Sequence, residues 1–334
     1  MSFFPPSQTI TFDAALRDLG DKNWKARARA AQALGDLGDP AERRRAIDAL
    51  LGALDDDRAD VRAEACGSLG TLGEAADAPR LVPALVKRLD DGAPTVRQHA
   101  AIALGSLGAE DGFAPLADAL RDGPADLRFQ AATSLAEIDP ARAFVPLVAA
   151  LDDKDAQVVS AAALSLGAIG DPRALPELAA RVDHTDAGAR FDVGYALAEL
   201  GDPRGRAALV IALVDEHRAW DAVSAIAKLG TPDDLDLLAR TIPVKATPVE
   251  AAVLAAGRVL ALAPDSPHTD DARKALLAAL ANRKTHVRSL AVEQLGEVGG
   301  AWAVAPLTKL AASRKGGELL DTIAAALQRI EGRP

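Results

Sequence analysis

The chain has 334 residues, of which 49% are hydrophobic and only 3% aromatic, so its core must be built from Ala, Leu and Val. Its formal net charge is −10, from 38 Lys+Arg against 48 Asp+Glu, and this balance disfavours nucleic acid as the main partner. The single cysteine, Cys66, excludes an internal disulfide, and no stretch is long and apolar enough to predict a membrane helix. A cytoplasmic location fits these features.

The chain is predicted to be repetitive after a short N-terminal arm. Residues 1–11 lack the basic region and long apolar run of a secretory signal. From Phe12 onward, a segment close to Val-Arg-x-x-Ala-Ala-x-x-Leu-Gly-x-Leu-Gly recurs about every 31 to 35 residues, with clear copies at 61–73, 96–108 and 287–299. Self-similarity at this period is typical of one helical unit stacked many times.

Each unit is predicted to contain two helices. We number the second helix from the Val of its Val-Arg pair, which is position 1; positions 1, 5, 8, 9 and 12 are small or aliphatic and form one helical face. The first helix, for example over 46–54 or 144–151, also has an apolar face at helical spacing. Position 9 marks ten units, at Leu34, Leu69, Leu104, Leu135, Leu166, Leu197, Ile226, Leu260, Leu295 and Leu327.

These elements predict one all-α domain over residues 1–334, a solenoid of about ten stacked hairpins. The arm would occupy 1–11, the repeats 12–314 and a C-terminal capping helix 315–334. Gly-Asp-Pro at 38–40, 170–172 and 201–203 predicts junctions: Gly ends one helix, Asp caps the next and Pro occupies its first turn.

Charged residues at fixed offsets predict a ladder of ion pairs along the array. An acidic or polar residue stands five positions before position 1, where we also expect it to cap the second helix; the acidic copies are Asp21, Asp56, Asp91, Asp122 and Asp153. Arg occupies position 2 in Arg27, Arg62, Arg97, Arg128, Arg190 and Arg288. The pattern is repeated too evenly to indicate a single anion site.

The Val-Arg-x-x-Ala-Ala-x-x-Leu-Gly-x-Leu-Gly-Asp-Pro string resembles HEAT-like repeats of the short bacterial type, named after phycobilisome bilin lyases, from about residue 12 to 330. The resemblance implies an α-solenoid. Among such proteins are protein-binding scaffolds and bilin lyase or isomerase subunits, which attach a linear tetrapyrrole to a phycobiliprotein; a more distant HEAT-like group comprises DNA glycosylases that remove alkylated bases. No metal motif, nucleophile elbow or phosphate-binding loop accompanies it, so we predict no catalytic residue, metal or cofactor.

In a HEAT-like array the second helices line the concave surface, and positions 3 and 7 are predicted to face its groove. These positions carry an apolar stripe of Ile102, Phe129, Leu164, Phe191, Tyr195, Trp220 and Leu254. Beside it lie the polar residues Gln98, His99, Gln130, Asp192 and Arg258. Exposed apolar and aromatic side chains favour a partner-binding groove, while closure of the array over them would make them a second core.

The predicted function is a non-catalytic scaffold that holds a partner peptide or helix in this groove. A bilin lyase-like, chromophore-handling subunit is the alternative, and a HEAT-like DNA glycosylase is a second alternative that the acidic charge opposes. The sequence does not exclude a small-molecule ligand. His184, His217 and His286 lie in turns beside carboxylates, without the tight spacing of a known metal site.

Overall fold

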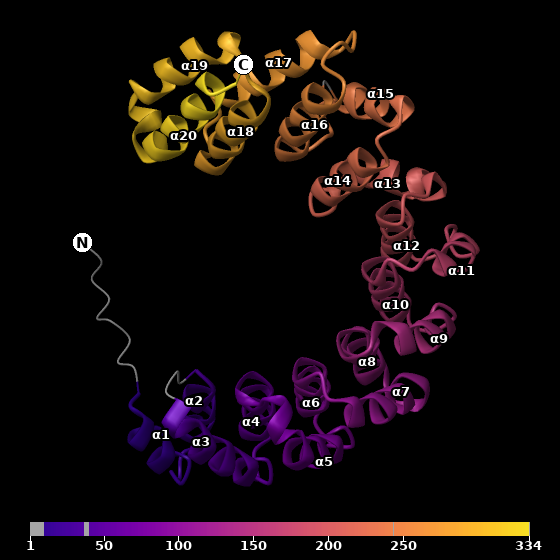
Figure 1. Cartoon of the computed structure of the whole chain (residues 1–334), viewed down its shortest axis with the longest axis vertical. Coiled ribbons are helices and arrows are strands. Elements are labelled where there is room, and N and C mark those ends of the chain that lie inside the picture. Colours follow the sequence, from indigo (N-terminus) through magenta and orange to yellow (C-terminus); the bar gives the residue numbers. More distant parts are fainter. Residues whose placement is uncertain (1–9, 37–39, 243, 334) are drawn as a thin grey trace. The chain divides into compact units, whose positions relative to one another are not determined.

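The structure, a computed structural model, describes residues 10–36, 40–242 and 244–333. Over this part of the chain it consists of twenty α-helices in ten sequential pairs, without strands (Figure 1). The prediction of an all-α solenoid of about ten helical hairpins is therefore confirmed.

The first helices of the pairs are α1 (Phe12–Asp18), α3 (Pro40–Ala53), α5 (Ala78–Arg88), α7 (Phe113–Asp122), α9 (Pro140–Ala150), α11 (Leu175–Ala179), α13 (Arg206–Ala212), α15 (Pro232–Thr241), α17 (Thr269–Ala279) and α19 (Ala301–Ala311). The second helices are α2 (Trp24–Gly35), α4 (Ala59–Leu72), α6 (Pro94–Leu107), α8 (Ala125–Ile138), α10 (Ala156–Ile169), α12 (Ala187–Glu199), α14 (Ala219–Leu229), α16 (Val249–Leu262), α18 (Thr285–Val298) and α20 (Leu320–Glu331). Short 3-10 turns occupy Ala75–Asp77, Glu110–Gly112, Pro172–Ala174, Pro203–Gly205 and Arg314–Leu319.

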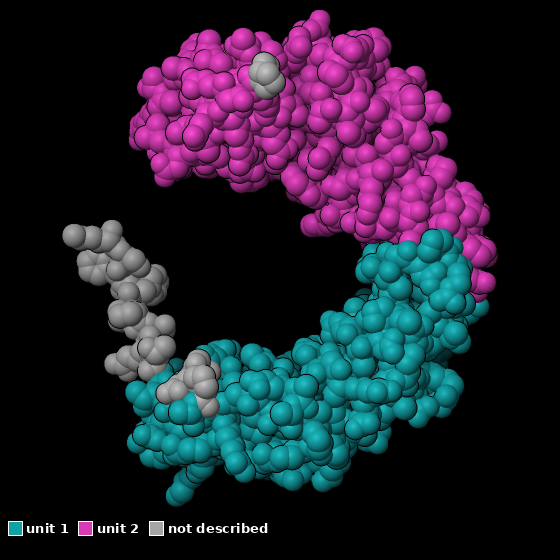
Figure 2. Space-filling view, in the orientation of Figure 1, with its two compact units in different colours: residues 1–174 teal, residues 175–334 magenta. Residues whose placement is uncertain are grey.

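Contacts divide the chain into two compact units, unit 1 (residues 1–174) and unit 2 (residues 175–334), shown separately coloured in Figure 2. Each unit holds five helix pairs, and within each unit every second helix packs against the next second helix (Figure 1). It stays a prediction that the two units form one continuous domain and that a cap follows residue 314. Most of the predicted N-terminal arm, residues 1–9, lies outside the described residues.

Small residues let neighbouring second helices approach closely. In α4 the predicted core positions Val61, Ala65 and Leu69 are completely buried. Gly70, at position 10, faces α6 so closely that a Cβ atom there would lie 2.7 Å from the Cα atom of Ala103. The Gly at position 10 thus sets the spacing of the second helices, because any side chain would force them apart.

The predicted junctions are confirmed where the structure describes them. Gly170 and Gly201 have φ angles of 76° and 77°, in the left-handed region that glycine adopts at helix ends. The next residue accepts a hydrogen bond from the main-chain N–H two positions on, at 2.9 Å for both Asp171 and Asp202. In the copy at 38–40, residues 38 and 39 lie outside the described residues.

The ion-pair ladder is present in unit 1. Three of its arginines each donate two hydrogen bonds of 2.7–2.8 Å to the carboxylate of the following repeat: Arg27 to Asp56, Arg62 to Asp91 and Arg128 to Asp153. Arg97 instead pairs with Asp126, at 2.8 and 2.9 Å, so the prediction of Asp122 at this step is wrong. Asp122 is exposed and held by Arg121 next to it, whereas Asp126 lies in the first turn of α8.

Residues of the ladder also shape their own turns. Arg62 donates to the carbonyl oxygens of Asp56 and Asp57, at 2.9 and 3.3 Å, in the turn before its own helix. Asp91 accepts the N–H of Ala93, which is the N-cap residue of α6, so it folds the turn rather than capping the helix as predicted. The hydrogen bond from Arg62 lowers the pKa of Asp91 below its ordinary value although burial opposes the shift.

Candidate functional site

Three apolar residues of the predicted stripe are exposed on unit 1. Ile102, Phe129 and Leu164 are 40%, 39% and 40% exposed. They lie on α6, α8 and α10, three consecutive second helices that pack side by side. We call Ile102, Phe129 and Leu164 the apolar row.

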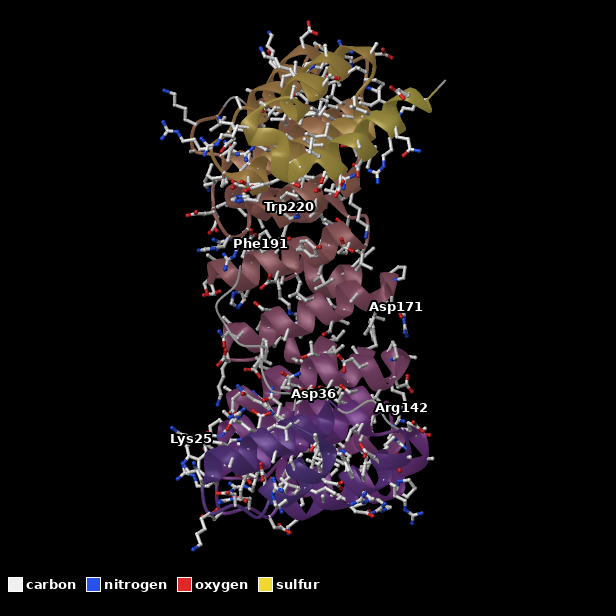
Figure 3. All side chains as sticks on the ribbon, turned by 90° about the vertical axis from the view of Figure 1, so that its left-hand side faces the viewer. Lys25, Asp36, Arg142, Asp171, Phe191 and Trp220 are labelled. Atoms are coloured by element: carbon white, nitrogen blue, oxygen red, sulfur yellow. The ribbon has the colours of Figure 1, made fainter. Side chains whose placement is uncertain are left out.

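The prediction of exposure is correct for only part of the stripe in unit 2. Trp220 on α14 is 42% exposed, and Tyr195 on α12 is half-buried. Phe191 and Leu254, in contrast, are only 7% and 3% exposed and belong to the core of this unit, so their predicted exposure is wrong. Figure 3 marks Phe191 and Trp220 on neighbouring helices.

Lateral packing explains the burial of Phe191, which stands at position 3. The solvent-facing positions of each second helix were predicted from its core face alone. Each second helix is, however, also covered on its flanks by the adjacent second helices. Phe191 lies under the guanidinium group of Arg218, 5.5 Å from the ring centroid, and packs against Tyr195 at a ring separation of 6.2 Å. Exposure is most regular at positions 7 and 11, whereas position 4 lies at the edge of the open face and position 3 is exposed only in some repeats, as at Phe129 and Trp220.

The polar residues predicted beside the stripe are distributed over both units. Gln98, His99, Gln130 and Asp192 are half-buried, and Arg258 is exposed on α16. The His99 Nδ1 atom lies 2.8 Å from the carbonyl oxygen of Ala63 on α4, and it donates this bond because a carbonyl only accepts. In the neutral ring the Nε2 atom then carries the lone pair and is a hydrogen-bond acceptor.

A pocket of about 270 Å³ lies on the same face of unit 1, where α2, α4 and α6 meet. Asp36, Glu64, Thr71, His99 and Ile102 line it. His99 and Ile102 were predicted site residues, but the two carboxylates were not. Their positions, 11 in the first repeat and 4 in the second, would have indicated them had the face been centred correctly.

Three larger hollows lie elsewhere on unit 1 and hold none of the predicted site residues. The first, of about 540 Å³, lies at α5 and α7, the second, of about 490 Å³, at α7 and α9, and the third, of about 410 Å³, at residues 121–123, 128 and 153–154. The second includes Val145, which is 73% exposed and apolar. Val145 lies on a first helix, α9, outside the row of second helices on which the predicted stripe lies.

Two of the three histidines that were predicted to lie in turns, His184 and His286, have side-chain partners, and His217 donates its main-chain N–H to Asp215 at 2.9 Å. His184 Nδ1 accepts the N–H of Asp186 at 3.1 Å, and His286 Nε2 lies 2.9 Å from a carboxylate oxygen of Glu250. Within the described part of the chain, no three or more His, Cys, Asp and Glu side chains are arranged to hold a metal ion. No helix in that part has the length and apolar character needed to cross a membrane.

The repeat geometry agrees with a comparison against protein families. The model of HEAT repeats matches residues 13–85, 71–136 and 113–197, which together cover more than half of the chain. The chain belongs to the HEAT-repeat family. The helix pairs of residues 198–333 continue the same arrangement beyond the matched region.

Solved structures that match the chain include YibA of Escherichia coli, with 25% identity over 67% of this chain and 82% of that chain and a TM-score of 0.47. The complex of CpcE and CpcF of phycocyanin lyase from Nostoc sp. PCC7120 is 21% identical over 82% and 97%, with a TM-score of 0.40. Human deoxyhypusine hydroxylase in complex with glycerol is 23% identical over 74% and 95%, with a TM-score of 0.34. Such low TM-scores add nothing about function. No curated protein matches the chain.

Proposed function

We propose that the chain is a non-catalytic scaffold that binds a peptide or helix of another protein on the open face of its second helices. The apolar row carries this proposal. Ile102, Phe129 and Leu164 are the large apolar residues that three successive helices of unit 1 expose on a face whose other positions are mainly small or polar. Neighbouring exposed apolar residues favour interaction with a partner, because covering them releases water.

The dimensions of the row limit the length of the partner segment. Packed helices lie about 8–10 Å apart, so three of them span roughly 16–20 Å. A helix of about 11–13 residues covers that distance at 1.5 Å per residue, and an extended segment needs only about 5–6 residues. A row on rigid helices is also preorganised, which reduces the entropy lost on binding.

Site-specific photocrosslinking tests the proposal. Burial raises the pKa of the Cys66 thiol to about 12, so a cysteine introduced at an exposed position is the one that reacts with a maleimide at neutral pH. A benzophenone maleimide on the Phe129→Cys variant should give a discrete protein adduct in an extract of the source cells. The matched Val145→Cys variant, labelled on α9, should give none.

Competition then shows whether the adduct depends on the apolar row. Excess unlabelled wild-type protein should suppress crosslinking from position 129, and excess Ile102→Glu/Leu164→Glu protein should not. Adducts from position 145 alone, or equal suppression by both competitors, would contradict the proposal. The chromophore-handling alternative stays a prediction, and a visible absorption change on adding a linear tetrapyrrole to the purified chain would favour it.

A further inference from the structure

The carboxylates of the pocket on α2, α4 and α6 differ from those of the ladder because they have no cationic partner in the described part of the chain. On the ladder, sheltered carboxylates have cationic partners: the side chains of Asp91 and Asp153 are 6% and 12% exposed, and each binds an arginine. Of the two pocket carboxylates, Glu64 is half-buried and Asp36 is exposed, and no Lys or Arg among the described residues lies within ion-pair distance of either. A sheltered carboxylate without a partner favours the arrival of a cation.

Three neutral polar side chains that line the pocket, those of Ser68, Thr71 and His99, already have a partner. The Ser68 hydroxyl donates to the carbonyl oxygen of Ala31 at 3.0 Å, and the Thr71 hydroxyl donates to that of Gly67 at 3.2 Å. His99 Nδ1 donates to the carbonyl oxygen of Ala63. Among the side chains that line the pocket, those of Asp36 and Glu64 are the ones that carry a negative charge, so they are the acceptors that a cation would bind.

The pocket also has an apolar side that joins it to the proposed binding face. Ile102 lines the pocket and is the first residue of the apolar row. A lysine or arginine side chain combines a cationic end with an aliphatic stem, so it could place the first on the carboxylates and the second against Ile102. Arg29 lies on α2, one of the three helices of the pocket, but does not line it.

We infer that this pocket receives a lysine or arginine side chain of the partner segment, whose apolar residues lie on Phe129 and Leu164. The inference rests on the proposed function and specifies its partner: a basic and apolar peptide rather than an acidic one. The volume of about 270 Å³ is sufficient for one long side chain, so a single basic residue of the peptide is expected to be selected.

A phage-displayed library of random 12-residue peptides, selected on the full-length chain, tests the inference. Peptides retained by wild type and lost on Ile102→Glu should carry Lys or Arg at one fixed distance from an apolar residue. For synthetic copies of these peptides, Asp36→Asn and Glu64→Gln should each weaken binding about threefold to tenfold, because each removes one of the two charges that the cation would contact. Asp60→Asn removes an exposed charge from α4 outside the pocket and should have no effect.

The outcomes separate the inference from the function on which it rests. If peptides bind in an Ile102-dependent way but show no basic residue, or bind the Asp36→Asn and Glu64→Gln variants as well as wild type, the pocket inference is wrong and the scaffold proposal survives. If no selected peptide depends on Ile102 or Phe129, both fail. Unchanged unfolding midpoints of the variants exclude loss of fold as the cause of weaker peptide binding. As a further test, Glu64→Lys should reverse the selection toward acidic peptides.

Discussion

Units 1 and 2 contain the same repeat but use the arginine at position 2 differently. In unit 1 this arginine binds both its own turn and a carboxylate of the next repeat, as Arg62 does. In unit 2, Arg190 and Arg288 bind carbonyl oxygens of their own turns at 2.7 and 3.0 Å, without a carboxylate partner among the described residues. Binding of the arginine to its own turn folds the repeat, and binding to the carboxylate of the next repeat couples neighbouring repeats. The comparison shows that these two roles are separable.

The exposed faces of the units differ as well. Unit 1 leaves Phe129 open on α8, whereas unit 2 buries Phe191 at the same position on α12. Arg218 stands at position 1 of the repeat that follows Phe191, and its guanidinium group covers the ring. Position 1 of the repeat that follows Phe129 is Val158, a short side chain that is itself buried in the core. A long residue at the start of one repeat can therefore close the face of the repeat before it.

The largest expected effect distinguishes the two roles of the arginine. Arg128→Met leaves the Asp153 carboxylate sheltered without its partner and should reduce the free energy of unfolding of unit 1 by about 3–5 kcal/mol. Arg190→Met removes only bonds to carbonyl oxygens and should cost unit 2 about 1 kcal/mol. Native-state hydrogen exchange measures each unit separately, and equal losses would show that the ladder does not couple repeats.

A smaller effect tests the difference between the two faces. Phe191→Ala removes a buried ring and should cost about 3 kcal/mol, whereas Trp220→Ala on the adjacent helix removes a ring that is 42% exposed and should cost about 1 kcal/mol. Thermal unfolding monitored by circular dichroism compares the two variants. A larger loss for Trp220→Ala would mean that Trp220, not Phe191, belongs to the core.

The ladder also predicts a dependence on pH. Since the pKa of Asp91 is lowered in the folded chain, its contribution to stability is present above the unfolded-state pKa of about 3.9 and is lost as the pH falls through the folded-state value. The difference in unfolding free energy between wild type and Asp91→Asn should therefore shrink from pH 6 to pH 2. Arg62→Met should show the same trend, and a difference that grows on acidification would contradict the pairing.

The smallest effect uses Cys66 as a reporter of unit 1. Its thiol is buried on α4, so a thiol reagent at neutral pH should label it only when this region opens. Arg128→Met should accelerate labelling, and Phe191→Ala in unit 2 should leave its rate unchanged. Rapid labelling of the wild type would show that α4 is open to solvent.

The repeat period was sufficient to predict the helix pairs, the core positions and three ion pairs of the ladder in unit 1, because each depends on contacts that recur at one spacing. Asp126 could not be distinguished from Asp122, since the choice depends on how the turn before α8 folds. Phe191 and Leu254 were misplaced for a related reason: helical periodicity defines the face opposite the core but does not indicate how far the neighbouring helices cover its flanks. The pocket carboxylates were missed for the same reason, because they stand at positions 11 and 4 and the exposed face was predicted at positions 3 and 7.

The most direct test of the central claim is the affinity of the crosslinked partner for a variant that lacks the apolar row. Ile102→Glu/Phe129→Glu/Leu164→Glu should weaken binding at least about a hundredfold by isothermal titration calorimetry, because buried apolar anchors dominate interface energies. Val145→Glu, on the exposed side of α9, should bind as the wild type does. Unchanged affinity of the triple variant, with its helical content intact, would contradict the assignment of this face as the binding surface.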